Sequence, residues 1–216
     1  MQPLYIDNHL LALLKPSNLL TQETESQKDS LEVRAKAFIK KEKNKPGKVF
    51  LHPISRLDKP VSGIVLFALT SKALSRMQEE QRQRKIKKEY LAWVEGTLKE
   101  KKETLTHFLE QGSHKAYVKP EGKKAILTYE VLEEKAGFSL VKIELLTGRY
   151  HQIRAQFSHI GHPILGDKKY GSTKALPRIL LHHYRVEFIH PVKQEKIILE
   201  DKNGKERLTE FLFPLN

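Results

Sequence analysis

The chain has 216 residues, 39% of them hydrophobic, and it carries 39 Lys and Arg against 26 Asp and Glu. The net charge of +13 and the pI of about 9.7 would attract polyanions, although a lysine-rich proteome would give the same bias. The absence of cysteine excludes disulfides, thiolate metal ligands and cysteine nucleophiles, and it fits a reducing compartment. No apolar run approaches the roughly 18 residues that span a bilayer, and the N-terminus lacks the features of a signal peptide. We therefore expect a cytoplasmic protein with no membrane partner.

The first part of the chain predicts a mixture of strands and helices. Strands are predicted at residues 3–7, 9–16 and 64–70, and helices at 31–43 and 72–88. Ser30 is suited to cap the first helix, and Thr70 or Ser71 to cap the second. Pro16 ends a strand and Pro46 follows a helix. The strand at 64–70 is apolar throughout, which indicates a buried position.

The rest of the chain predicts mainly strands. They are expected at residues 89–96, 125–134, 138–147, 179–191 and 195–200, with a helix at 151–161, a turn-rich loop at 162–172 and a terminal helix or apolar tail at 207–215. Gly161 suits the position just after the helix. Residues 97–124 hold seven lysines and predict an exposed loop or hairpin, either an RNA-gripping arm or a solvated surface. Many strands with few helices indicate an α+β fold.

Several kinds of chemistry can be set aside. The glycine-rich loops that bind nucleotides and dinucleotides are absent. Six histidines lie between residues 151 and 190, but no HExxH motif or suitably spaced carboxylate accompanies them. His182 and His183 would point to opposite faces of a strand, so they could not share one ion. We expect neither a metal nor a cofactor.

Two arginine-rich stretches remain. One is "SRLD" at residues 55–58, and the other is "LTGRYHQIRAQFSHIGHPILGDKKYG" at 146–171. In the second stretch Arg149 precedes the predicted helix and Arg154 lies inside it. Cations among aromatic rings suit a folded or base-flipped RNA, because the charges meet phosphates and the rings meet bases. Taken singly, each arginine would be an ordinary solvated residue.

Five blocks of the chain resemble the RluA-like branch of the pseudouridine synthases. In that family His-Arg-Leu-Asp is followed by two residues, Thr-Ser-Gly and an apolar strand, as in "RLDKPVSGIVLFALT". The blocks "LYIDNHLLALLKPSNLL", "KKEYLAWVEG", "TGRYHQIRAQFSHIGHPILGDKKYG" and "LLHHYRVEFIHPV" resemble the other family stretches, in the family's order, over residues 4–192. Ser55 and Val61 stand where the family has His and Thr, which concerns how the aspartate loop is held.

The resemblance implies an RNA isomerase that needs no metal or cofactor and converts uridine to pseudouridine in ribosomal or transfer RNA. By motif position Asp58 is the family's essential aspartate, which attacks the sugar or removes a sugar proton. Tyr90 is the tyrosine that packs on the detached uracil, and Arg154 is the basic partner of Asp58. Arg56 would displace the target base or bind phosphate.

The same resemblance implies further properties. Arg149, His151 and Lys88 would contact RNA. The fold would be one α+β domain over residues 1–216, with a mixed, mostly antiparallel sheet and a central RNA-binding cleft. We expect a monomer whose RNA contacts come from this domain, because the N-terminal S4-type module found in many relatives does not precede the catalytic strands.

Other interpretations stay open at this point. Asp58 could be a turn-former beside Pro60, and Tyr90 and Arg154 could be a packing residue and a surface cation. The protein could then be a catalytically idle RNA-binding or chaperone protein on the same fold. A nucleoside hydrolase or glycosidase acting on small molecules would need a second carboxylate near Asp58 and little charge bias. No second carboxylate is apparent near Asp58, and the net charge of +13 does not fit a protein with little charge bias.

Overall fold

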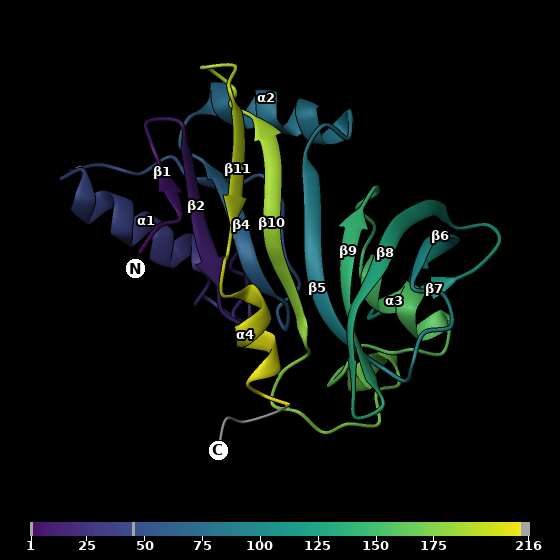
Figure 1. The fold of residues 1–216 in the computed structure, drawn as a ribbon. Coiled ribbons are helices and arrows are strands. Elements are labelled where there is room, and N and C mark those ends of the chain that lie inside the picture. The colour runs from purple at the N-terminus through teal and green to yellow at the C-terminus, as the bar shows by residue number, and fades with distance from the viewer. Residues whose placement is uncertain (1, 45, 213–216) are drawn as a thin grey trace. The chain divides into compact units, whose positions relative to one another are not determined.

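The computed structural model describes residues 2–44 and 46–212. The backbone contacts group the chain into two compact units (Figure 1). Unit 1 comprises Met1–Ile86 and Arg185–Asp201, and unit 2 comprises Lys87–Tyr184 and Lys202–Asn216. The single domain expected over the whole chain stays a prediction.

Unit 1 is built from antiparallel strands and two helices. Its elements are β1 (Tyr5–Ile6), β2 (Leu10–Lys15), α1 (Leu31–Glu42), β3 (His52–Pro53), β4 (Ser62–Ala68), α2 (Ser71–Arg82), β11 (Lys196–Glu200) and the end of β10 (Leu181–Ile189). β2 pairs with β1 and β4, β3 pairs with β4, and β10 pairs with β11, all antiparallel. Lys15 lies opposite Gly63, so the end of β2 lies beside the start of β4.

The core of unit 1 follows from its apolar pattern. Every residue of β4 is buried, as the run of apolar residues predicts. Leu66 of β4 packs in one hydrophobic cluster with Leu10 of β2, Met77 of α2 and Phe188 of β10. Burial of this strand keeps the residues just before it, which include the "RLD" motif, at a fixed edge of the core.

Both predicted helix caps are confirmed. The Ser30 hydroxyl accepts a hydrogen bond from Val33 N at 3.2 Å, and the Thr70 hydroxyl accepts one from Ala73 N at 3.2 Å. The prediction that the second helix extends to residue 88 is wrong, because α2 ends at Arg82. Residues 87 and 88 are instead drawn into β5, whose pairing with β9 outweighs their helix propensity.

Unit 2 is built from antiparallel strands and one main helix. Its elements are β5 (Lys87–Glu95), β6 (Lys102–Gln111), β7 (Ala116–Val118), β8 (Lys123–Lys135), β9 (Phe138–Leu145), α3 (Gln152–His159), the 3-10 turn η1 (Lys168–Tyr170), the start of β10 and α4 (Gly204–Thr209). The strands follow the order β5-β9-β8-β6-β7, and each neighbouring pair is antiparallel. These pairs agree with the predicted α+β class and mostly antiparallel sheet.

The two faces of β5 have different partners. Leu91 and Trp93 point to one face and join a cluster with Leu140 of β9. Tyr90 points to the other face and lies opposite Ile143. Since successive strand residues alternate between faces, this division is the one that the sequence predicts.

Residues 97–124 form a hairpin, one of the two predicted alternatives. We call residues 102–126, which comprise β6, β7 and the start of β8, the arm. α3 lies against β6 and β7 (Figure 1). A Cβ on Gly122 would come within 2.5 Å of the Leu109 backbone, so only glycine allows the chain to pass this closely into β8.

The remaining helices agree with the sequence in part. α3 is followed by Gly161 in the left-handed conformation (φ 83°), which confirms the predicted helix stop. The terminal helix is α4, which begins before the predicted 207–215 segment, and residues 213–215 of that segment lie outside the described residues. No helix in the described part of the chain is long and apolar enough to cross a membrane.

Candidate active site

Asp58 lies at the start of a tight turn in unit 1. Val61 N donates to the Asp58 carbonyl at 3.0 Å, which closes the turn directly before β4. Asp58 is partly buried and Arg56 is exposed. Val61, one of the two departures from the family motif, has a buried side chain, and Ser55, the other, is partly buried. The turn forms with these residues in place.

Hydroxyl groups hold the backbone on both sides of Asp58. Thr21 Oγ1 donates to the Leu57 carbonyl at 2.9 Å and accepts from Leu57 N at 3.1 Å. Ser17 Oγ donates to the Pro60 carbonyl at 2.6 Å. The loop after β2 therefore fixes the segment on which the carboxylate is mounted.

A buried lysine completes this attachment. Lys15 Nζ donates to the carbonyls of Pro16 at 3.0 Å, Leu19 at 2.7 Å and Lys59 at 3.0 Å. Burial lowers the pKa of Lys15 to about 7, and the negative charge of Asp58 opposes that shift. Lys15 thus joins the end of β2 to the Asp58 turn and adds a cation whose charge interacts with Asp58. Lys15 was not among the predicted site residues, although a lone lysine that ends the apolar run "LLALLK" is a visible signal.

In unit 2, Tyr90 and Lys88 lie two residues apart on β5 and therefore share a face. The ring of Tyr90 is buried and stacks on His183, with 4.6 Å between centroids. The Lys88 ammonium has no hydrogen-bond or ion-pair partner among the described residues, and burial lowers the pKa of Lys88. A Cβ on the exposed Gly148 would lie 3.8 Å from Lys88 Nζ, so the ammonium lies beside a backbone without a side chain.

The loop that carries Arg149 and His151 is bound to the edge of β8. Where β9 ends, the Ile126 carbonyl accepts from Thr147 N at 3.2 Å and from Gln152 Nε2 at 3.0 Å. Arg149 Nε donates to the Lys124 carbonyl at 3.0 Å. Residues 146–152 therefore continue along the strand edge that β9 leaves, and they border the arm.

Arg154 forms a buried ion pair with Asp167. Its Nε lies 2.6 Å from Asp167 Oδ2 and its Nη2 lies 2.9 Å from Oδ1, and both side chains are at most 5% exposed. Its guanidinium also lies over the Tyr170 ring, 4.9 Å from the centroid. Asp167 is a partner that the sequence analysis treated only as part of a loop, although the acidic residue in "LGDKKY" was a visible signal.

His151 lies between two tyrosines. Its ring stacks on Tyr150 with 3.8 Å between centroids, and its Nδ1 lies 2.9 Å from the Tyr170 hydroxyl. The same hydroxyl accepts from Ala116 N in β7 at 2.7 Å. His151 adopts φ 51°, a left-handed conformation that turns the chain into α3. Tyr170 therefore connects this loop to the arm.

The predicted site residues divide between the units. Asp58 and Arg56 lie on unit 1, and the other five, Lys88, Tyr90, Arg149, His151 and Arg154, lie on unit 2. The roles expected of them stay predictions. No group of three or more potential metal ligands is found among the described residues.

The sequence model of a family described as RNA pseudouridylate synthase matches residues 9–159, which include all seven predicted site residues. The chain belongs to this family. The family assignment made from the five motifs is therefore confirmed. The match covers the turn with Asp58, the strand with Tyr90 and the whole of α3.

Individual pseudouridine synthases agree with this assignment. The dual-specificity RNA pseudouridine synthase RluA of Pasteurella multocida is 36% identical, over 88% of this chain and 88% of its own. The tRNA pseudouridine synthase C of Haemophilus ducreyi is 32% identical, over 91% of this chain and 88% of its own. The structure of human RNA pseudouridylate synthase domain containing 4 matches with a TM-score of 0.78 at 20% identity, over 96% of this chain and 92% of that one, which shows the shared fold.

Replacement of Lys15 by methionine should destabilise the protein. It removes the donor from three backbone carbonyls, of which that of Leu19 is buried and those of Pro16 and Lys59 are partly buried, and an unmade buried hydrogen bond costs about 1–3 kcal/mol. Urea denaturation of Lys15→Met and of the control Lys59→Met, whose side chain is exposed, measures this difference. Equal unfolding midpoints of the two variants would contradict the role of Lys15.

The pH dependence of stability tests the Lys15 charge separately. The folded pKa of about 7 lies below the ordinary lysine value, so above pH 7 the unfolded state binds more protons than the folded state. The free energy of unfolding of the wild type should therefore rise with pH between about 7 and 9, by at most about 1.4 kcal/mol per unit, relative to Lys15→Met. A constant difference between the two proteins across this range would show that Lys15 is not titrating there.

Loss of Asp167 should destabilise unit 2 strongly. Asp167→Ala leaves the Arg154 guanidinium buried without its bidentate partner, and breaking such a pair costs about 3–5 kcal/mol. The matched control is Glu130→Ala, which removes the exposed partner of Lys142, an ion pair with 2.9 Å between the charged atoms that should contribute little. Thermal or urea unfolding of both variants compares them, and equal effects would mean that the buried pair contributes no more than the exposed one.

Proposed function

We propose that this protein is a cytoplasmic, monomeric enzyme that isomerises uridine to pseudouridine in ribosomal or transfer RNA, with Asp58 acting on the sugar. Family membership supports the reaction. The observation that carries the role of Asp58 is its turn, which is closed by Val61 and attached through the Lys59 carbonyl to the buried Lys15. A reactive carboxylate gains from such fixed placement, because catalysis depends on held geometry.

The reaction breaks the bond between N1 of uracil and C1′ of ribose and forms a bond between C5 and C1′. In one route Asp58 attacks C1′, the uracil leaves as an anion, and the rotated uracil displaces the ester through C5. In the other route Asp58 removes a sugar proton and returns it later. The proton on C5 is lost and N1 gains one, so no other reactant is consumed.

Arg154 would assist Asp58 electrostatically. Asp167 engages Nε and Nη2 of the guanidinium, which fixes the plane of the fork. We propose that Arg154 acts as the basic partner of Asp58. Such a charge-assisted pair favours the ionised carboxylate and aims it.

Tyr90 would retain the uracil while it is detached. His183 stacks on one face of the phenol ring, which holds the ring in a fixed plane. The opposite face or the hydroxyl would then meet the flipped base. Stacking on an aromatic residue contributes roughly 1–3 kcal/mol per base, and it would keep the leaving group close to C1′.

The phosphates of the target nucleotide would meet the cations around Gly148. Lys88 brings a partly buried ammonium that has no acceptor among the described residues, and the glycine backbone leaves room for an incoming anion. Arg149 and His151 lie in the same loop, and the exposed Arg56 would support the displaced strand. A buried cation without an anionic partner is costly, so a substrate phosphate would relieve that cost.

The relatives favour structured RNA as the substrate. Their names include a tRNA pseudouridine synthase and a dual-specificity RNA pseudouridine synthase. Comparing pseudouridine maps of ribosomal and transfer RNA from cells with and without the gene identifies the target uridine. Identical maps, together with purified enzyme that releases no tritium from RNA labelled at C5 of uridine, would favour a catalytically idle RNA-binding protein.

Replacement of Asp58 should abolish isomerisation and preserve RNA binding. Asp58→Asn keeps the shape of the side chain but removes the nucleophile or base, so turnover should fall at least about a hundredfold. The measurement is tritium release from RNA labelled at C5 of uridine, with Asp29→Asn, an exposed carboxylate of unit 1, as the control. Turnover of Asp58→Asn close to that of the control would reject Asp58 as the reacting group.

Substitutions of Tyr90 should separate its ring from its hydroxyl. Tyr90→Leu removes both and should be nearly inactive, whereas Tyr90→Phe keeps the stack and should be slow only after the glycosidic bond has broken. Positioned acids and bases typically contribute about 10² to 10⁴ in rate. Single-turnover assays measure the two steps, and a Leu variant as fast as wild type would make Tyr90 a packing residue.

A further inference from the structure

The arm presents one face that is not used for packing within unit 2. Its inner face carries Leu109, Ala116 and Ala125, which pack in a cluster with Ala155 of α3 and with Tyr170. The alternating pattern of the strands directs the residues between these positions to the opposite face. We call that opposite surface, defined by Phe108 of β6, Tyr117 of β7 and Lys124 of β8, the outer face.

The register places these three residues side by side. Phe108 lies directly opposite Lys124, and Tyr117 lies opposite Glu110, two residues from Phe108 on the same strand. The two rings are therefore diagonal neighbours on adjacent strands, within the reach of aromatic side chains. They form a pair of rings on one surface.

Both rings are strongly exposed. Phe108 is 44% exposed and Tyr117 is 45% exposed, although neighbouring inner residues such as Leu109 are buried. Burial of a phenyl ring is among the strongest contributions to a core, so these two rings add little to the fold. Exposed aromatic residues on a sheet surface are a known means of receiving unpaired bases.

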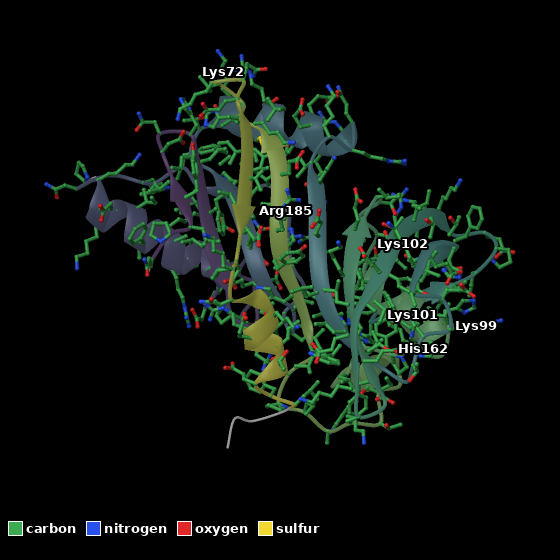
Figure 2. The ribbon with its side chains drawn as sticks, viewed as in Figure 1. Lys72, Lys99, Lys101, Lys102, His162 and Arg185 are labelled. Carbon is green, nitrogen blue, oxygen red and sulfur yellow. The ribbon has the colours of Figure 1, made fainter. Side chains whose placement is uncertain are left out.

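A lysine lies beside each ring, and Glu110, which lies opposite Tyr117, is paired with Lys119 at 3.3 Å. Lys115 Nζ lies over the Tyr117 ring, 5.0 Å from its centroid, and Lys124 lies across from Phe108. Figure 2 labels Lys99, Lys101 and Lys102 on the β6 side of unit 2, where the arm begins. Charge and aromatic rings on one surface match a polyanion with unpaired bases better than they match an apolar protein partner.

The outer face leads to the candidate site. The Lys124 carbonyl accepts a hydrogen bond from Arg149 Nε, so the motif loop, residues 146–152, borders the outer face. Gly148 precedes Arg149 in that loop, and the Lys88 ammonium lies beside Gly148. A strand lying on the outer face would therefore continue toward the residues assigned to the target nucleotide.

We propose that single-stranded RNA flanking the target uridine binds across the outer face, with two unpaired bases stacked on Phe108 and Tyr117 and the backbone beside Lys115 and Lys124. This proposal rests on the proposed function, because the isomerisation of RNA provides the ligand. It adds a binding surface separate from the residues that act on the uridine.

The test uses a single-stranded oligouridylate that contains one 2-aminopurine, with a blunt RNA duplex for comparison. The double variant Phe108→Ala/Tyr117→Ala should bind the single strand at least about tenfold more weakly and should lose the fluorescence change of the stacked 2-aminopurine. Duplex binding should change little. The control is Leu132→Ala at the bulge of β8, which removes an apolar side chain of similar exposure, 46%, from the same sheet.

Conservative substitutions separate the stack from the charge. Phe108→Tyr/Tyr117→Phe should bind like the wild type because both rings are kept. Lys115→Ala/Lys124→Ala should reduce the salt dependence of binding, by about 0.7 in the log–log slope for each phosphate that the variant no longer neutralises. The double alanine variant of the rings should keep the wild-type slope.

The outcomes separate this proposal from the proposed function. Unchanged single-strand binding and fluorescence in the ring variant, with isomerisation intact, would overturn the outer face and leave the enzyme assignment standing. If the wild type binds the single strand through its rings but releases no tritium, the outer face stands and the enzyme assignment is overturned. A ring variant that differs from the wild type only in concentration-dependent self-association would identify the face as a protein contact and overturn the proposal.

Discussion

The three carbonyl oxygens around the Lys15 ammonium are the constraint on which the Asp58 turn depends. Burial of an ammonium is costly unless its donors are satisfied, and here the acceptors are backbone carbonyls of the loop that follows β2 and of the turn itself. Below its pKa of about 7, the Lys15 ammonium is charged and contributes a positive potential near Asp58. The same side chain thus has a structural and an electrostatic effect. Thr21 and Ser17 act on the adjacent peptide groups, so the carboxylate is mounted on backbone with little freedom.

In unit 2 the buried cation Arg154 is likewise held in place by its partners. Arg154 is fixed by a bidentate carboxylate and by the face of an aromatic ring, both from the segment that follows α3. Arginine suits this position because its fork can bind one carboxylate and still present donors in another direction. Lysine would not, since its ammonium has no fixed plane. The motif loop is held to β8 by backbone and side-chain hydrogen bonds rather than by apolar packing.

Much of this arrangement could be predicted from local signals. The caps at Ser30 and Thr70, the stop at Gly161 and the alternation around Tyr90 each depend on residues close in sequence, and the structure confirms them. The family motifs then supplied the identity of the chain. Contacts between residues that are far apart in the sequence could not be predicted from local signals. Lys15 and Lys59 are brought together by strand register, and Arg154 and Asp167 by the path of a loop. The predicted end of α2 was wrong because the pairing of β5 with β9, which is not local, competes with helix propensity.

Tyr170 gives the arm and the cation a common neighbour. Its hydroxyl accepts from Ala116 N in β7, its ring lies under the Arg154 guanidinium, and the same hydroxyl bonds His151. A displacement of β7 must therefore lengthen a bond to the residue that supports the guanidinium. One phenol thus supports β7, His151 and the Arg154 guanidinium together, and removal of its hydroxyl alone would leave only the ring beneath the cation.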